Sequence, residues 1–308
     1  MLSLRRILVP TDEAPCADRA FAHAAFLAER HGAELHVLRV LPVTGTEPGR
    51  PRERPVPDGV RLVEATRQAL DVADEIVRTA RDADLVVMGT HGRRGVARVA
   101  VGSTTEQVLR RADCPVLAVG LDAERSVPAS VERVLVPVDF SDSSGPALAV
   151  AAELAAVYGA RVDALHAAYV PDLPDIYGIG LHFAATYPDV VTNARRALQS
   201  LVREHVAPER AGEVTVRVGP PGPTVLEEAE RLGSGLLVMP THGRTGLGRL
   251  AFGSVAEGVL RRAPCPVFAI PSYGRIPLPD DADVDLPVAR GSLATERKLG
   301  DVLANHDV

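Results

Sequence analysis

Apolar residues along this chain form short continuous runs that alternate with longer stretches at helical spacing. The short runs predict buried strands, and the longer stretches predict helices. In the first half the predicted strands are 7–9, 35–41, 60–65, 85–88 and 115–119, and the predicted helices are 18–30, 68–80 and 103–111. Strands that alternate with helices favour a parallel α/β sheet.

The same course is repeated in the second half of the chain. Gly92, Gly102 and Cys114 recur 151 residues later within the nearly identical stretches 88–116 and 239–267. The stretches 5–12 and 132–139 also match, at an offset of 127 residues. We therefore predict two tandem domains, 1–121 and 131–271, the second with strands 134–138, 162–168, 214–218, 236–239 and 267–270 and helices 147–158 and 254–262.

The second copy is longer because it has one more predicted helix. Residues 189–206 place Val190, Ala194, Leu198 and Val202 on one face at helical spacing. The first copy has a linker rich in Pro, Gly and Arg at 42–59 instead, so we expect the linker, the other domain or a partner to shield its sheet. Residues 272–308 lose all periodicity and predict a disordered tail.

Composition excludes several classes of protein. An apolar content of 46% suffices for two domain cores, and the net charge of −6 gives no field that attracts nucleic acid. No run of 18 uncharged apolar residues occurs, so we expect a soluble cytoplasmic protein without a membrane partner. Cys114 and Cys265 precede apolar runs and are read as core residues. Cys16, near a predicted helix start, leaves a redox role open as the weaker alternative.

Two segments in each copy follow strands at the place where α/β sheets bind ligands. In the first copy they are Pro10, Thr11 and Asp12, after the first strand, and the stretch from Gly89 to Ser103, after the fourth. In a doubly wound sheet of order 3-2-1-4-5 these strands are neighbours at the switch point, so both segments face one crevice.

The residue types in this crevice suit a nucleotide. Gly89 and Gly92 permit close backbone approach and unusual φ values, and Gly102 and Ser103 offer free N–H groups at a helix N-terminus. Asp12 can accept a hydrogen bond from an adenine amino group or a ribose hydroxyl, or hold a metal-bound water. The intervening loop contributes Arg93, Arg94 and Arg98. The pattern is neither a Walker loop nor a G-x-G-x-x-G fingerprint.

The spacing G-x2-G-x9-G-[S/T] after a fourth strand, with V-P-x-D in the first, resembles the universal stress protein family. The resemblance covers residues 4–121 and 131–271 and implies tandem five-stranded sheets of the adenine nucleotide alpha hydrolase-like fold that bind ATP, with Mg²⁺ as a candidate companion. It assigns the adenosine to Asp12 and Val40, the ribose region to Met88 and Gly89, and the phosphates to Gly92, Arg93, Gly102, Ser103 and Thr104. The second-copy counterparts are Pro137, Val138, Asp139, Met239, Gly243, Arg244, Gly253, Ser254 and Val255.

One position separates the two copies. Pro240 stands where the first copy has Gly89, so the second site loses a backbone donor and has φ fixed near −65°. We expect ATP in the first domain more than in the second. The protein would then be a nucleotide-dependent regulator of the stress response, paired through the fifth strands of its domains and assembled as a homodimer.

Simpler interpretations stay open beside this one. The glycines can serve turns alone, Asp12 and Asp139 can serve as helix N-caps, and His91 and His242 can order their loops. The alternative functions are a slow ATP hydrolase and a protein-interaction scaffold with an empty cleft.

Overall fold

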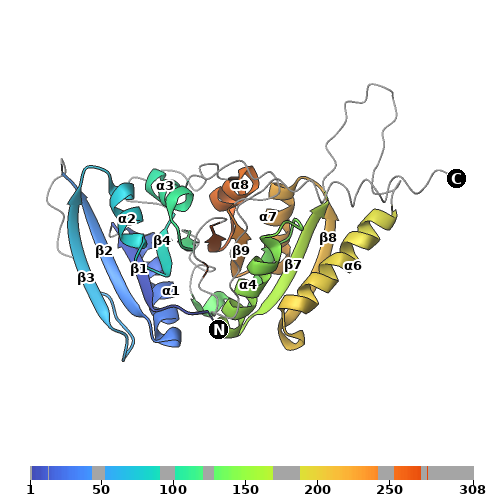
Figure 1. The fold of residues 1–308 in the computed structure, drawn as a ribbon, viewed down its shortest axis with the longest axis horizontal. Helices are drawn as coiled ribbons and strands as arrows, with labels where there is room; N and C mark the ends of the chain where they lie inside the picture. Colours follow the sequence, from blue (N-terminus) through green and yellow to red (C-terminus); the bar gives the residue numbers. More distant parts are fainter. Residues whose placement is uncertain are drawn as a thin grey trace, which may run out of the picture.

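Ten strands form one continuous sheet across the described part of the chain, in the order β3-β2-β1-β4-β5-β10-β9-β6-β7-β8. The computed structural model describes residues 2–12, 14–43, 53–90, 101–120, 128–168, 188–241, 253–271 and 276. Each half of the sheet has the predicted order 3-2-1-4-5 with parallel strands. The predicted doubly wound α/β fold is therefore confirmed, with β3 and β8 toward opposite ends of the molecule (Figure 1).

Both halves contain the same succession of elements, with one additional helix in the second. The first half contains β1 (Arg6–Thr11), α1 (Pro15–His31), β2 (Glu34–Pro42), β3 (Leu62–Ala69), α2 (Val72–Ala80), β4 (Leu85–Gly89), α3 (Ser103–Arg111) and β5 (Val116–Val119). The second contains the 3₁₀ turn η1 (Pro128–Ser130), β6 (Arg133–Pro137), α4 (Ser144–Tyr158), β7 (Arg161–Ala168), α6 (Pro188–His205), the 3₁₀ turn η2 (Pro208–Arg210), β8 (Ala211–Val218), α7 (Pro221–Leu232), β9 (Leu236–Pro240), α8 (Ser254–Arg262) and β10 (Val267–Ile270). Gly32 and Gly159 end α1 and α4 with φ of 64° and 75°, a left-handed conformation that favours glycine.

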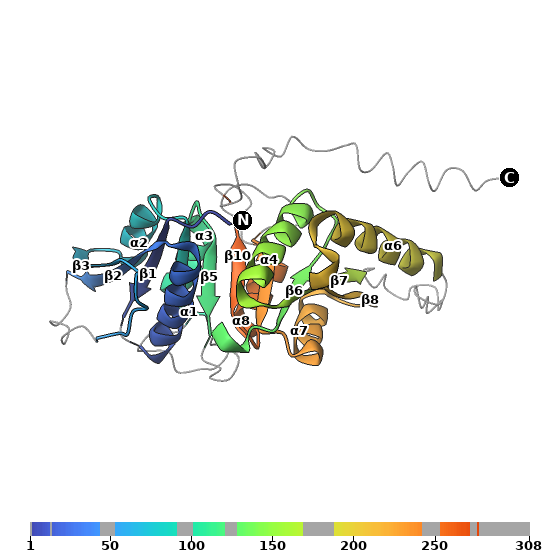
Figure 2. The ribbon, with the colours of Figure 1, turned by 90° about the horizontal axis from the view of Figure 1, so that it is seen from below.

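The two halves are joined by the antiparallel pair β5–β10, whose register runs from Val267 opposite Ala118 to Ala269 opposite Val116. Figure 2 shows these two strands together at the centre of the molecule. Each would be an unpaired edge if its half stood alone, and pairing satisfies both rows of backbone groups. The expected pairing through the fifth strands is confirmed, and the two predicted sheets are corrected to a single one.

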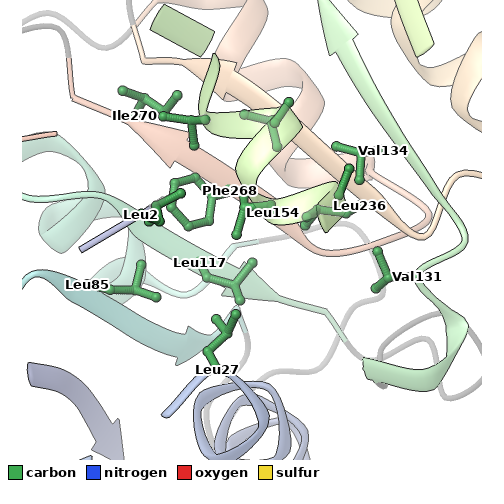
Figure 3. Packing of buried hydrophobic residues seen from close by; sticks show 14 of the residues in the cluster. Leu2, Leu27, Leu85, Leu117, Val131, Val134, Leu154, Leu236, Phe268 and Ile270 are labelled. Carbon is green, nitrogen blue, oxygen red and sulfur yellow. The ribbon is translucent and has the colours of Figure 1, made fainter. Parts of the chain in front are cut away.

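Helices cover both faces of the sheet. One buried cluster receives side chains from α1, α4 and α6, and the other from α2, α3, α7 and α8. In the first cluster, Leu117 of β5 and Phe268 of β10 lie with Leu27 of α1 and Leu154 of α4, all at most 1% exposed (Figure 3). Because both clusters contain residues from both halves, the halves share their hydrophobic core.

The predicted boundaries of β3 and α2 are wrong. The strand extends to Ala69, opposite Pro42 of β2, and the helix begins at Val72 instead of residue 68. Asp71 marks the helix start, because its side chain accepts a hydrogen bond from the N–H of Asp74 (3.0 Å). No residue of β3 is fully buried and half of them are exposed, so apolar residues do not delimit this edge strand.

The linker of the first half takes the place that α6 occupies in the second. Between β2 and β3 the described residues are 43 and 53–61, and none of them is helical. Residues 53–57 instead lie along α1 and line a groove of about 670 Å³ with it. Arg54 fastens this segment, donating to Asp18 (3.2 Å) and lying over the ring of Phe21 (5.5 Å). The linker therefore shields part of α1, and Arg54 is held against this helix with a side chain only 8% exposed. The predicted tail lies outside the described residues except for Ile276, which packs against the first cluster.

A network of ion pairs supports the outer strands of the second half. Asp163 of β7 is fully buried and accepts hydrogen bonds from Arg133 (2.7 and 2.8 Å) and from the N–H of Glu213 (2.7 Å). The last bond fills a register shift between β7 and β8, where β8 begins earlier than the predicted residue 214. Gly212 is required beside it, because a Cβ there would collide with the Asp163 carboxylate.

Glu228 of α7 belongs to the same network. It is completely buried and accepts hydrogen bonds from Arg231 (2.8 and 3.1 Å) and Arg217 (3.3 Å). The hydrogen bond from Arg231 is the main cause that holds the pKa of Glu228 below its usual 4.5. Its contribution to stability is therefore complete above pH 4.5 and is lost as the pH falls through the lowered pKa.

Glu228→Gln is expected to lower the free energy of unfolding by about 1–3 kcal/mol at pH 7, because two arginines lose a buried charged partner. The variant should also lose less stability than the wild type when the pH falls below 4.5. Urea denaturation at pH 7 and at pH 4 measures both effects. Glu227→Gln, next to it but with a side chain 61% exposed, is the matched control. Parallel acid dependences for wild type and Glu228→Gln would contradict the assignment.

Candidate functional site

The ends of β1 and β4 lie side by side because these strands are hydrogen-bonded neighbours. β1 ends at Thr11, just before Asp12, and β4 ends at Gly89. The second half places Asp139 and Pro240 in the same way, at the ends of the neighbouring strands β6 and β9. The structure thus brings the first predicted segment of each half next to the described start of the second, at the switch point of the sheet.

The other predicted residues fall into two groups. Val40 of β2 and Met88 of β4 pack in the cluster on the α2 and α3 face, so they lie on one side of the sheet. Thr104 and Val255 are the second residues of α3 and α8. Pro10 lies in β1, Pro137 and Val138 lie at the end of β6, and Met239 lies in β9. The loop residues outside the described part of the chain are His91, Gly92, Arg93, Arg94, Arg98, His242, Gly243 and Arg244.

Gly102 and Ser103 begin α3, but they contribute differently from the prediction. The N–H of Gly102 donates to the carbonyl of Thr90 (2.6 Å), so it is not a free donor for a ligand. Gly253 makes the corresponding bond to Thr241 (2.9 Å). This bond ties the start of each helix to the strand before it. The donors at this helix end are the first-turn N–H groups that follow, beginning at the exposed Ser103.

Thr105 is a site residue that sequence reasoning missed. Its hydroxyl donates to the carbonyl of Gly89 (2.9 Å) and holds the end of β4 against the first turn of α3. The second half has Ala256 at this position, next to the helix start that follows Pro240. A comparison of the two repeats could have indicated this role, because the copy that has proline in place of the glycine also has alanine in place of the threonine.

Gly89 is required for space rather than for an unusual backbone angle. It is not among the described residues with positive φ, so the predicted need for special φ values is wrong at this position. A Cβ at Gly89 would lie 2.6 Å from Cys16 Sγ and 3.0 Å from Cys16 Cβ. The second half has Ser143 where the first has Cys16, and Pro240 where it has Gly89. The copy that has proline at this position therefore also has a smaller residue, serine in place of cysteine, at the start of the adjacent helix.

The carboxylates of Asp12 and Asp139 both order the turn before a helix. Asp12 Oδ1 accepts from the N–H of Ala14 (3.1 Å). Asp139 Oδ1 accepts from the N–H and the hydroxyl of Ser141 (2.9 and 2.5 Å) and from the hydroxyl of Ser144 (3.0 Å). The N-cap residues of these helices are Ala14 and Ser143, and neither helix has a side-chain cap, so the N-cap alternative for Asp12 and Asp139 is wrong. Each carboxylate instead stabilises the turn that precedes the helix.

An aromatic pair distinguishes the second half further. Phe140, directly after Asp139, has a φ of 60° and lies against the ring of His166 with 4.6 Å between the centroids. His166 Nδ1 in turn bonds to the carbonyl of Val138 (2.8 Å). A positive φ in a phenylalanine is strained, which indicates that the surrounding contacts fix this turn. In the first half, the residue that corresponds to His166 is the buried Arg39.

The linker reaches the first site through Arg54. Its Nη2 donates to the hydroxyl of Thr11 (3.2 Å), and its side chain is only 8% exposed. Thr11 is the last residue of β1, so the linker is anchored at the mouth of the predicted crevice. The second half has α6 in place of this linker, which makes the two crevices unequal at their outer sides.

The remaining candidate chemistry is limited. Cys16, Cys114 and Cys265 are all buried and outside disulfide bonds, which agrees with the core interpretation of Cys114 and Cys265. Within the described ranges, no cluster of three or more His, Cys, Asp or Glu residues could hold a metal ion by itself. No helix in the same ranges is long and apolar enough to cross a membrane.

The sequence matches a known family model over most of its length. The model of the universal stress protein family matches residues 3–75, 52–120 and 130–271. The chain belongs to the universal stress protein family. The repeated matches agree with the two halves of the sheet, so this is a tandem member.

Relatives of this universal stress protein include tandem-sized proteins of mycobacteria. Universal stress protein Rv2005c of Mycobacterium tuberculosis is 32% identical over 195 residues, which cover 62% of this chain and 63% of that protein. A universal stress protein of Mycolicibacterium smegmatis is 29% identical over 297 residues, which cover 86% of this chain and 96% of that protein. The match to the first relative thus spans less than two thirds of its length.

Solved structures share the fold. The functionally unknown protein PA1789 from Pseudomonas aeruginosa PAO1 has a TM-score of 0.66 at 18% identity, covering 88% of this chain and 93% of its own. A universal stress protein from Archaeoglobus fulgidus has a TM-score of 0.59 at 21% identity, covering 86% and 96%. At these identities the similarity shows the α/β fold of two joined halves.

Proposed function

We propose that this universal stress protein binds ATP in its first half and acts as a nucleotide-dependent regulator of the stress response. The adenosine would lie near Asp12, Val40 and Met88, and the phosphates would lie at the N-terminus of α3. Catalytic turnover is not part of the proposal, because the Asp12 carboxylate is engaged in ordering the turn before α1.

The arrangement of α3 and the end of β1 carries this proposal. α3 begins at the exposed Ser103, and its Thr105 bonds to Gly89 at the end of the strand that neighbours β1, at the switch point of the sheet. A helix N-terminus attracts phosphate through its unpaired N–H groups and its dipole. The Gly102–Thr90 and Thr105–Gly89 bonds hold this end in place, so little ordering would accompany binding.

Mg²⁺ fits the site only as a companion of the nucleotide. Since the described residues contain no metal cluster of their own, phosphate oxygens and water would supply most of its ligands. Asp12 is the carboxylate of the first crevice that could hold a water bound to the ion.

The second half supports a different role, as a binding surface without nucleotide. Pro240 lacks a backbone donor, Asp139 Oδ1 accepts three hydrogen bonds, and Phe140 packs on His166. The proposal also includes a cytoplasmic location and association of two chains. Because β5 and β10 pair with each other, such association would use another surface.

Ser103→Glu tests the site with little damage to the fold. A carboxylate in the first turn suits the helix dipole but repels phosphate, so ATP affinity should fall about tenfold or more. Isothermal titration with ATP, and mass spectrometry of any nucleotide that co-purifies, measure the effect. Ser254→Glu at the start of α8 is the matched control and should leave ATP binding unchanged. The proposal fails if the wild type binds no ATP, or if only Ser254→Glu weakens binding.

A further inference from the structure

Four charged side chains link α3 and α8 across the junction of the two halves, a glutamate from the first turn and an arginine from the last turn of each helix. Within each helix, Arg110 pairs with Glu106 (3.0 Å) and Arg261 pairs with Glu257 (2.9 Å). Across the junction, Arg110 pairs with Glu257 (3.2 Å) and Arg261 pairs with Glu106 (3.3 Å). The glutamates and the arginines are each 151 residues apart, so the cluster follows the repeat of the sequence.

Glu106 stands close to the proposed phosphate position. It lies in the first turn of α3, one helical turn after Ser103. The Cα–Cβ bonds of an α-helix tilt towards its N-terminus, so this side chain leaves the backbone towards the end where phosphate would bind, about one helical turn away. An unneutralised negative charge there opposes the binding of a triphosphate.

Both oxygens of Glu106 are paired with arginine. Oε1 is paired with Arg110 of the same helix, and Oε2 is paired with Arg261 of the other half. The first half therefore depends on the second for one of the two cations that offset this charge. The side chains are 30–39% exposed, so solvent screens the pairs and each effect is moderate.

We propose that Arg261 is a positioning residue for the nucleotide site of the first half, although it belongs to the second. It holds the Glu106 carboxylate in an ion pair and offsets its repulsion of the ATP phosphates. Arg110 has the same relation to Glu257 at the start of α8. The inference rests on the proposed ATP site and adds a contribution from the opposite half to it.

Arg261→Gln is expected to lower ATP affinity roughly two- to fivefold, the range for one charge near a helix end. Adenosine affinity should stay unchanged, because adenosine carries no phosphate. Glu106→Gln combined with Arg261→Gln should restore ATP affinity, because the repelling charge is then removed. When every chain also carries Ser254→Glu, the titrations measure binding at the first site alone. Arg262→Gln, at the exposed neighbour, is the control and should change neither affinity.

Restored ATP affinity in the double variant would distinguish this positioning role from a role in simply joining the two halves. The double variant has lost the Glu106–Arg261 pair just as Arg261→Gln has, so a purely structural role predicts no recovery. The inference is overturned if Arg261→Gln lowers ATP and adenosine affinity equally, or if the double variant binds ATP no better than Arg261→Gln. Absence of ATP binding in the wild type would instead overturn the proposed function, and this inference with it.

Discussion

Gly89→Pro is expected to weaken ATP binding in the first half by about 5- to 150-fold, corresponding to ~1–3 kcal/mol for a lost donor. The N–H of the next residue, Thr90, donates to Val119 of β5. Successive N–H groups along a strand point to opposite sides, so the N–H of Gly89 points towards β1 and the crevice. Proline removes this donor without removing a hydrogen bond to β5. Titration with ATP measures the loss.

Two further variants separate the lost donor from the steric effect. Gly89→Ala keeps the N–H but adds a Cβ beside Cys16 Sγ, so it should lower stability and largely preserve affinity. Cys16→Ser with Gly89→Pro reproduces the pair found at Ser143 and Pro240, and should regain stability without regaining affinity. If Gly89→Pro binds ATP as tightly as the wild type, the N–H of Gly89 is not a ligand donor.

Asp163→Ala is expected to lower the free energy of unfolding by about 2–4 kcal/mol, the largest stability loss predicted for this protein. The substitution removes the buried partner of Arg133 and leaves the N–H of Glu213 without its acceptor at the register shift of β8. Urea denaturation monitored by circular dichroism measures the loss.

The exposed Asp113 provides the control for this prediction. Asp113→Ala should stay within about 0.5 kcal/mol of the wild type, as surface substitutions usually do. A comparable loss in both variants would show that Asp163 contributes no more than a surface carboxylate.

The sequence predicted the parts of the fold that repeat or that are fully buried. The helix start at Ser103, the strand order and the pairing of β5 with β10 follow from the repeated phrase and the alternation of elements. The full length of β3 could not be predicted, because an exposed edge strand carries no continuous apolar run.

The contacts within the site were harder to predict, because they join residues far apart in the chain. That Gly89 leaves room for Cys16, and that Thr105 donates to Gly89, appears only when the end of β4 is placed against α1 and α3. The N–H of Gly102 was expected to be free, but the structure pairs it with Thr90. The positions of these residues at strand ends and at a helix start were predictable, and the partners of their hydrogen bonds were not.

The antiparallel pairing of β5 with β10 has a consequence for how this protein can evolve. Two separate chains joined through these strands would associate only at sufficient concentration, whereas a tether makes the pairing intramolecular. In a pair of identical chains every substitution occurs twice, but in a tandem chain it occurs once. Gly89 and Pro240 show one position changed in this way, and Thr105 and Ala256 show another. Duplication within one chain thus turns a symmetric pair into two halves that selection can change separately.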